Sequence, residues 1–187
     1  MDDSTAASGT EPYRESAEAY TRGTQSGAGS RIQDERYRAR LQAEERVYKD
    51  CAAVHDLPAI FHYWSERYIR PKLEAFGFNG PNGMFCRYLS EQCERRKNDR
   101  KRFVSIGSGN CDLEIELAAN LRALGHSDFV IDCLDLNAAM LERGRSAAVG
   151  ERVAGQLHFV QEDFNRWTPT HEYDAVIANQ AFFWTQL

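Results

Sequence analysis

The spacing of apolar residues changes near residue 103, and the change divides the chain into two parts. Before this point, the apolar and aromatic residues of the stretch 60–69 recur at helical spacing. After it, short apolar runs alternate with helical stretches. The runs are "RFVSI", "DFVIDCLDL", "LHFVQEDF" and "YDAVIAN". We predict that Gly125 ends the first of these helical stretches and that Asn137 caps the second. Strands that alternate with helices imply parallel pairing, so we predict a doubly wound α/β sheet of about four strands with N-terminal helices.

The part before residue 103 divides again. Residues 1–30 are rich in Ser, Thr, Gly and Ala, and this composition predicts a disordered tail. Residues 31–102 predict a helical region: a charged, largely exposed helix, a helix with an aromatic stripe that Pro71 interrupts, and a third helix. We interpret the basic run over 95–102 as a solvated link into the first strand. Residues 103–187 form the predicted sheet domain.

The composition of the chain argues against several kinds of partner and binding site. The 187-residue chain has a net charge of −5, which argues against nucleic acid or an anionic membrane as a partner. The five cysteines lack the spacing of a zinc site, so we predict no metal and reduced thiols. A signal peptide and an apolar segment of membrane-spanning length are both missing from the sequence, which favours the cytoplasm.

The stretch "VSIGSGNC" joins the first predicted strand to the helix after it. Gly107 allows a sharp turn, and Gly109 allows a ligand to approach the backbone without meeting a Cβ atom. A dinucleotide fingerprint would have a third glycine where this chain has Asp112, whose charge would repel a phosphate. A nucleoside without phosphates is the ligand that this loop favours.

Two carboxylates follow the next two strands. Asp135 could accept hydrogen bonds from the vicinal hydroxyls of a ribose, and Asp163 could accept one from an adenine amine, with Phe164 beside the ring. Each residue has a plainer interpretation: Asp135 as a helix cap and Asp163 as a turn residue. The presence of both carboxylates favours the ligand.

Other polar and aromatic residues have structural interpretations. The acidic residues at the start of the helix after the loop are expected to stabilise its N-terminus and to face water; they are Asp112, Glu114 and Glu116. Cys111 and Cys133 are interpreted as small apolar fillers. The aromatic stretch 62–64 is expected to pack a helix on the sheet, with an acceptor pocket as the alternative.

The ordered motifs "FVSIGSGNCD", "CLDLNAAML", "FVQEDF" and "YDAVIANQ" resemble those of the class I S-adenosylmethionine-dependent methyltransferases over about residues 103–180. The resemblance implies a Rossmann-like fold, S-adenosyl-L-methionine as cofactor, and methyl transfer to an unidentified acceptor, most simply a small molecule. It also implies that the glycine loop passes the methionine part, that an acid binds ribose, and that other residues flank adenine or face the reactive side. By position, the cofactor-binding residues are Gly107, Ser108, Gly109, Asp135, Leu136, Asp163, Phe164 and Asn179. No catalytic residue is assigned.

The sequence departs from the family in two places. It has Ser105 and Cys111 where the family often has an acid and a glycine. It also ends soon after the fourth strand, so we expect an unpaired strand edge that forms a homodimer or binds a completing chain, or else a truncated product of weak stability. A non-catalytic remnant that binds the cofactor or a partner is the alternative function. A nucleotide-dependent oxidoreductase is a third possibility, which Asp112 disfavours.

Overall fold

The computed structural model describes residues 34–39, 41–43, 46, 59–95 and 99–179. The chain forms two compact units, 1–44 and 45–187, and the described residues of the first are helical. The predicted tail over 1–30 lies outside the described residues. Among those that are described, no helix combines the length and the apolar character that crossing a membrane requires.

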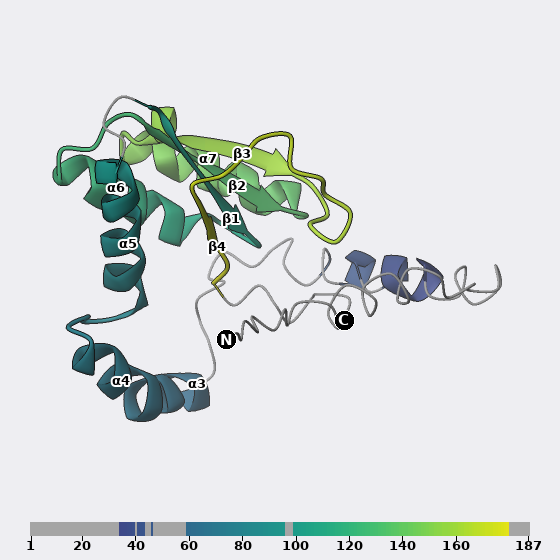
Figure 1. The fold of residues 1–187 in the computed structure, drawn as a ribbon. Coiled ribbons are helices and arrows are strands. Elements are labelled where there is room, and N and C mark those ends of the chain that lie inside the picture. Colours follow the sequence, from purple (N-terminus) through teal and green to yellow (C-terminus); the bar gives the residue numbers. More distant parts are fainter. Residues whose placement is uncertain (1–33, 40, 44–45, 47–58, 96–98, 180–187) are drawn as a thin grey trace, which may run out of the picture. The chain divides into compact units, whose positions relative to one another are not determined.

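The centre of the second unit is a four-stranded sheet with the order β3-β2-β1-β4 (Figure 1). The strands are β1 (Lys101–Ile106), β2 (Phe129–Asp135), β3 (Leu157–Gln161) and β4 (Ala175–Ile177). All neighbouring pairs are parallel. The chain moves outward from β1 to β3 and then returns to the other side of β1, so the predicted Rossmann-like, doubly wound sheet is confirmed. In such sheets ligands bind outside the carboxyl ends of the strands, where the direction reverses.

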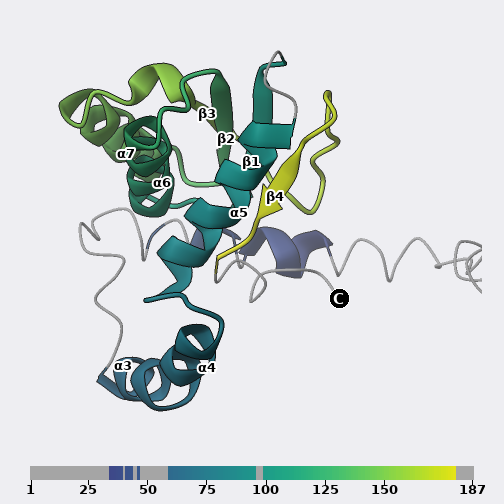
Figure 2. The ribbon, with the colours of Figure 1, turned by 60° about the vertical axis from the view of Figure 1, so that its left-hand side comes forward.

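Three helices bury one face of this sheet (Figure 2): α5 (Pro81–Arg95), α6 (Asp112–Ala123) and α7 (Ala138–Gly150). Leu117 and Leu121 of α6 are fully buried with Phe103, Phe129 and Ile131 of the sheet. Gly125 ends the α6 segment with a φ of +91°, as the sequence predicts. The core that these helices form fixes the glycine loop between β1 and α6.

The connection from β3 to β4 crosses the other face of the sheet and contains no helix in residues 162–174. It is held there by a buried carboxylate of β2, because the Tyr173 hydroxyl donates to Asp132 at 2.7 Å. Arg102 and His158 reach the same carboxylate at 3.3 and 3.2 Å. Burial and the hydrogen bond to Asp132 raise the pKa of Tyr173 to about 12.

The end of the basic run is part of the sheet. Lys101 is 3% exposed, and its ammonium group lies 3.6 Å from Asp174, just before β4. Asp174 also accepts from the backbone N–H of Arg102 at 2.9 Å. The interpretation of this run as a solvated link is therefore wrong at these two residues, because carboxylates distant in sequence neutralise them.

The N-terminal helices continue through the proline that was expected to interrupt them. α3 (Ala59–Trp64) leads into the π-helical turn η1 (Ser65–Ile69) and then into α4 (Arg70–Ala75). Pro71 lies in the first turn of α4, where its missing N–H is not needed. Tyr63 and Trp64 are 52% and 54% exposed, so the expectation that these aromatic residues pack on the sheet is wrong.

Candidate functional site

The glycine loop turns sharply at the carboxyl end of β1. Gly107, Gly109 and Cys111 have φ values of +67°, +56° and +61°. The backbone N–H groups of Gly107 and Ser108 both donate to the Leu134 carbonyl, at 2.8 and 3.1 Å. The loop is therefore fixed to the end of β2, and its two glycines adopt left-handed conformations that a side chain would strain.

Asp135 joins the loop to the end of β2. One of its carboxylate oxygens accepts from the Gly109 N–H at 2.7 Å, and the other accepts from the Asn137 N–H at 2.8 Å. Burial raises the pKa of Asp135, while hydrogen bonds from backbone N–H groups oppose the rise. Each carboxylate oxygen can accept a further hydrogen bond. The structure thus brings together the predicted glycine and the predicted acid.

The cap of α7 is the neighbouring Asn137. Its side-chain oxygen accepts from the N–H groups of Ala139 and Met140, at 3.0 and 3.2 Å. The predicted cap at Asn137 is confirmed. Asp135 supports this residue through its backbone and does not cap the helix itself, which leaves its carboxylate at the edge of the sheet.

Gly144 and Arg143 of α7, which the sequence interpretation missed, contact the glycine loop. A Cβ atom on Gly144 would lie 2.7 Å from the Asn110 carbonyl oxygen and 3.1 Å from the Cys111 side chain. The Arg143 Nε donates to the Asn110 side chain at 3.0 Å. The available signal was a glycine inside a helical stretch, which often marks a close approach of two backbones.

The second predicted acid, Asp163, organises a turn. It accepts at its side chain from the Asn165 N–H, at 3.0 Å, and at its carbonyl from the N–H groups of Arg166 and Trp167. It lies close to the end of β2, because the preceding Glu162 donates its N–H to the Asp135 carbonyl. Asp163 and the half-buried Phe164 therefore lie at the predicted edge, and the turn interpretation also holds.

The two remaining predicted residues lie at the same edge. Leu136 is half-buried, and its carbonyl accepts from the Gln161 side chain at 3.3 Å. Asn179 follows β4 by two residues and is half-buried. Because Ile177 pairs with Ser105, Asn179 continues β4 toward the level of the glycine loop.

The prediction that the acids at the start of α6 face water is wrong for Glu114. Asp112 and Glu116 are exposed, but Glu114 is 2% exposed and accepts from the Ser105 hydroxyl at 2.5 Å. Burial raises its pKa to about 7, and the hydrogen bond from Ser105 opposes the rise. The sequence had a usable signal, because Ala118 and Leu121 repeat the helical face of Glu114 and both are buried.

The two cysteines near Glu114 are apolar fillers, as predicted. Cys111 and Cys133 are fully buried in the core. A hydrogen bond with Cys111 and burial raise the pKa of the Cys133 thiol well above its ordinary value. A thiol in that condition is a poor nucleophile.

Polar atoms without a hydrogen-bond partner gather around this loop. Within the described residues, buried atoms of this kind are the Ser108 hydroxyl, one carboxyl oxygen of Glu114 and the side-chain nitrogen of Asn137. All three residues lie in the glycine loop or in the first turns of α6 and α7. Buried polar groups are rarely left unpaired in proteins, so this cluster is suited to a polar ligand.

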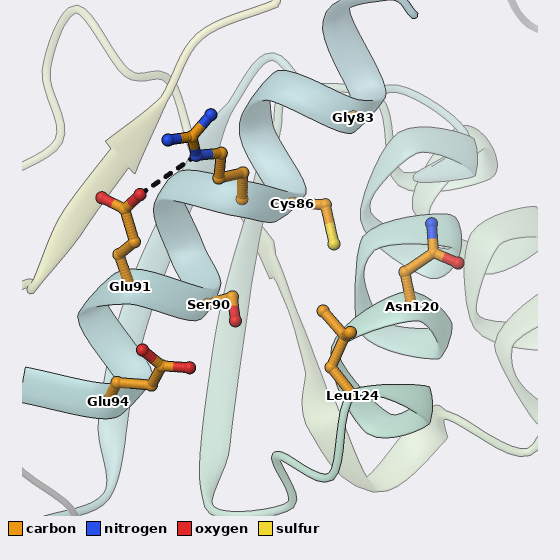
Figure 3. A pocket seen from close by; sticks show the side chains of 8 residues that line it. Gly83, Cys86, Ser90, Glu91, Glu94, Asn120 and Leu124 are labelled. Atoms are coloured by element: carbon orange, nitrogen blue, oxygen red, sulfur yellow. Dashed lines mark hydrogen bonds and ion pairs between the residues drawn. The ribbon is translucent and has the colours of Figure 1, made fainter. Parts of the chain in front are cut away.

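A hollow of about 450 Å³ lies elsewhere, between α5 and the C-terminal part of α6 (Figure 3). Both polar and apolar groups line it, and the Arg87–Glu91 ion pair lies along its α5 side. Asn120 of α6 and Leu124, which directly follows this helix, are two turns or more beyond the glycine loop. The hollow is therefore separate from the residues that the loop brings together.

Comparisons with solved structures found similar chains at low sequence identity. The chain is similar to S-adenosylmethionine-dependent methyltransferases in complex with S-adenosyl-L-homocysteine from Thiobacillus denitrificans and Geobacter sulfurreducens. The first is 19% identical and the second 15%; each match covers 69% of this chain and 46% of the other, with a TM-score of 0.41. A putative methyltransferase of the same kind from Methanococcus maripaludis is 24% identical, with 52% and 43% covered and a TM-score of 0.39.

The chain spans less than half the length of each of these structures. No protein-family model and no curated protein sequence matches it. Because the identities and TM-scores are low, the assignment of the fold rests on the strand order and the glycine loop described above.

Proposed function

We propose that this chain binds S-adenosyl-L-methionine at the carboxyl edge of its sheet and belongs to an enzyme that transfers the methyl group to a small-molecule acceptor. The observation that supports the proposal most is the hydrogen bond between the Gly109 N–H and the Asp135 carboxylate. It joins a glycine loop, which a ligand can approach closely, to an acid that can accept from vicinal hydroxyls.

The residues at this edge fit the cofactor. The unpaired hydroxyl of Ser108 and the unpaired amide nitrogen of Asn137 are available to polar groups of a ligand. Asp112 and Glu114 stand at the start of α6, where a pyrophosphate would need an uncharged helix end. These acids favour a nucleoside without phosphates over NAD, and a cationic ligand over an anionic one.

Each residue has a part in the proposed site. Asp135 would hold the ribose, Leu136 and Phe164 would flank the adenine, and Gly107 to Gly109 would leave room for the methionine part. When bound, the cofactor supplies an activated methyl group, so the protein mainly has to orient the acceptor and exclude water. Asn179 is the residue of the described chain best situated to face the acceptor.

Calorimetric titration with S-adenosylmethionine, S-adenosylhomocysteine and NAD tests the proposal. We expect binding of both sulfur nucleosides and not of NAD. Asp135→Ala is expected to weaken binding by about 2 kcal/mol, the size of a lost hydrogen bond to a charged group. Glu162→Ala, an exposed acid beside the same edge, is the matched control and should leave affinity unchanged.

Three results would contradict the proposal or one of its parts. NAD binding in preference to the sulfur nucleosides would favour the oxidoreductase, and unchanged affinity in a folded Asp135→Ala variant would remove the ribose assignment. Cofactor binding without turnover against any small acceptor would favour the non-catalytic alternative.

We also propose that the free side of β4 is a site of strand pairing. Within the described part of the sheet, β4 pairs with β1 alone, and its Val176 is 61% exposed. An unpaired strand edge with an apolar side chain is suited to binding a strand, here of a second copy or of another polypeptide.

A further inference from the structure

Glu114 is a buried acid of the proposed site to which no contact with the ligand has been assigned. Its side chain is held in one orientation, because one carboxyl oxygen accepts from Ser105 at 2.5 Å. The other oxygen is buried and lacks a hydrogen-bond partner among the described residues. Ser105 lies two residues before Gly107, so the carboxyl lies against the strand end that leads into the glycine loop.

The charges around Glu114 come mainly from other acids. Asp112 of α6 and Asp135 at the end of β2 both disfavour its ionised form. Cys133 of β2 also lies close enough to Glu114 for the two groups to interact electrostatically. From α7, Arg143 approaches the loop, where its Nε is hydrogen-bonded to the Asn110 side chain.

A buried acid among other acids responds strongly to an added positive charge. The ionised form is disfavoured by burial, which brings the pKa to about 7, so the group is about half protonated near neutral pH. A cation bound at the loop would offset the repulsion from Asp112 and Asp135 and would lower this pKa. A neutral ligand of the same shape would not.

We propose that Glu114 makes the glycine edge selective for a cationic ligand and that binding of the cation releases a proton from its carboxyl to solvent. The inference rests on the proposed function: S-adenosylmethionine carries a sulfonium charge that the thioether product, S-adenosylhomocysteine, lacks. Loss of the methyl group thereby weakens the attraction between the ligand and the acids of the loop, and the carboxyl takes up its proton again. The same acid favours cofactor entry and product release.

The test is calorimetry of both ligands in two buffers of different ionisation enthalpy, with the full chain, at several pH values between about 6 and 8. We compare the wild type with Glu114→Gln, which keeps the shape and a hydrogen-bond acceptor for Ser105. Glu116→Gln, the same change at an exposed position of the same helix, is the control. Protons released by the ligands themselves are common to all three proteins and cancel in the comparison.

For S-adenosylmethionine at pH 7, we expect the wild type and Glu116→Gln to release up to about half a proton more than Glu114→Gln, because a group near its pKa is half protonated. For S-adenosylhomocysteine we expect no such difference. By proton linkage, the ratio of the wild type's affinity for S-adenosylmethionine to its affinity for S-adenosylhomocysteine then rises with pH, by at most about tenfold per pH unit. We expect the part of this rise that comes from Glu114 to be missing in Glu114→Gln.

Ser105→Ala is a second variant, useful where Glu114→Gln fails to fold. The Ser105 hydrogen bond lowers the pKa of Glu114, so its removal should move the pH range of proton release upward. Equal proton release by the wild type and Glu114→Gln, or a pH range that Ser105→Ala leaves in place, would overturn this inference alone. Failure of both ligands to bind would overturn the proposed function and this inference with it.

Discussion

Replacing Gly144 by alanine adds one methyl group where α7 passes beneath the glycine loop. The new carbon would lie 2.7 Å from the Asn110 carbonyl oxygen and 3.1 Å from both Cβ and Sγ of Cys111. Carbon atoms normally pack about 3.5–4.0 Å from their neighbours. A backbone carbonyl cannot rotate away as a side chain can, so α7 or the loop must move.

The size of the effect follows from two opposing terms. Overpacking of this kind costs about 1–3 kcal/mol, and alanine in a helix interior gains about 1 kcal/mol over glycine. We therefore expect Gly144→Ala to lower the free energy of unfolding by about 1 kcal/mol. Gly150, at the end of the same helix, has nothing within 4 Å of the equivalent carbon, so Gly150→Ala should be neutral or raise it by up to about 1 kcal/mol.

Thermal unfolding followed by circular dichroism measures this difference. A gap of about 1–2 kcal/mol between the two variants corresponds to about 2–8 °C in Tm for a chain of this size. Equal melting temperatures, or a Gly144→Ala protein more stable than the wild type, would refute the close packing of α7 against the loop.

Two further predictions concern the other face and the edge of the sheet. Tyr173→Phe removes the hydroxyl that donates to Asp132, so we expect urea denaturation at pH 8 to give a free energy of unfolding lower by about 1 kcal/mol. Because folding raises the pKa of Tyr173 from 10.0 to about 12, the wild-type advantage is complete below pH 10.0 and is lost as the pH rises to about 12; equal stabilities at pH 8 would count against the bond. At β4, sedimentation velocity at a protein concentration on the order of tens of micromolar should show dimers of the wild type and monomers of Val176→Lys. The reason is that a charge on an edge strand opposes pairing. A wild type that stays monomeric would exclude a second copy as the partner.

The sequence predicted the parts of the fold that depend on local pattern. The four strands and the helix cap at Asn137 follow from apolar runs and from a residue type that favours the cap. The meeting of Gly109 with Asp135 was predictable as well, because parallel strands bring their carboxyl ends to one edge.

Other features depend on contacts that no local pattern records. Lys101 and Arg102 belong to a basic run, and their acidic partners lie in other strands and loops. Glu114 is paired with Ser105 across the interface between a helix and a strand, and a general preference of acids for helix starts gave the wrong environment for it. For Gly144, the sequence contained the glycine but not the carbonyl that it accommodates.

The strand order also has a consequence for how the chain folds. The elements from β1 to β3 follow one another closely in the sequence, so each can pack on a neighbour that has just formed. β4 instead has to return to β1, and the contact between Arg102 and Asp174 closes a loop of 72 positions. Closing a long loop costs entropy before its contacts form. Here the three residue pairs between β4 and β1, together with the bonds of Asp174 and Tyr173, offset that cost. We therefore expect the β4 side of the site to assemble last and to open first, and the glycine loop and Asp135 to form early.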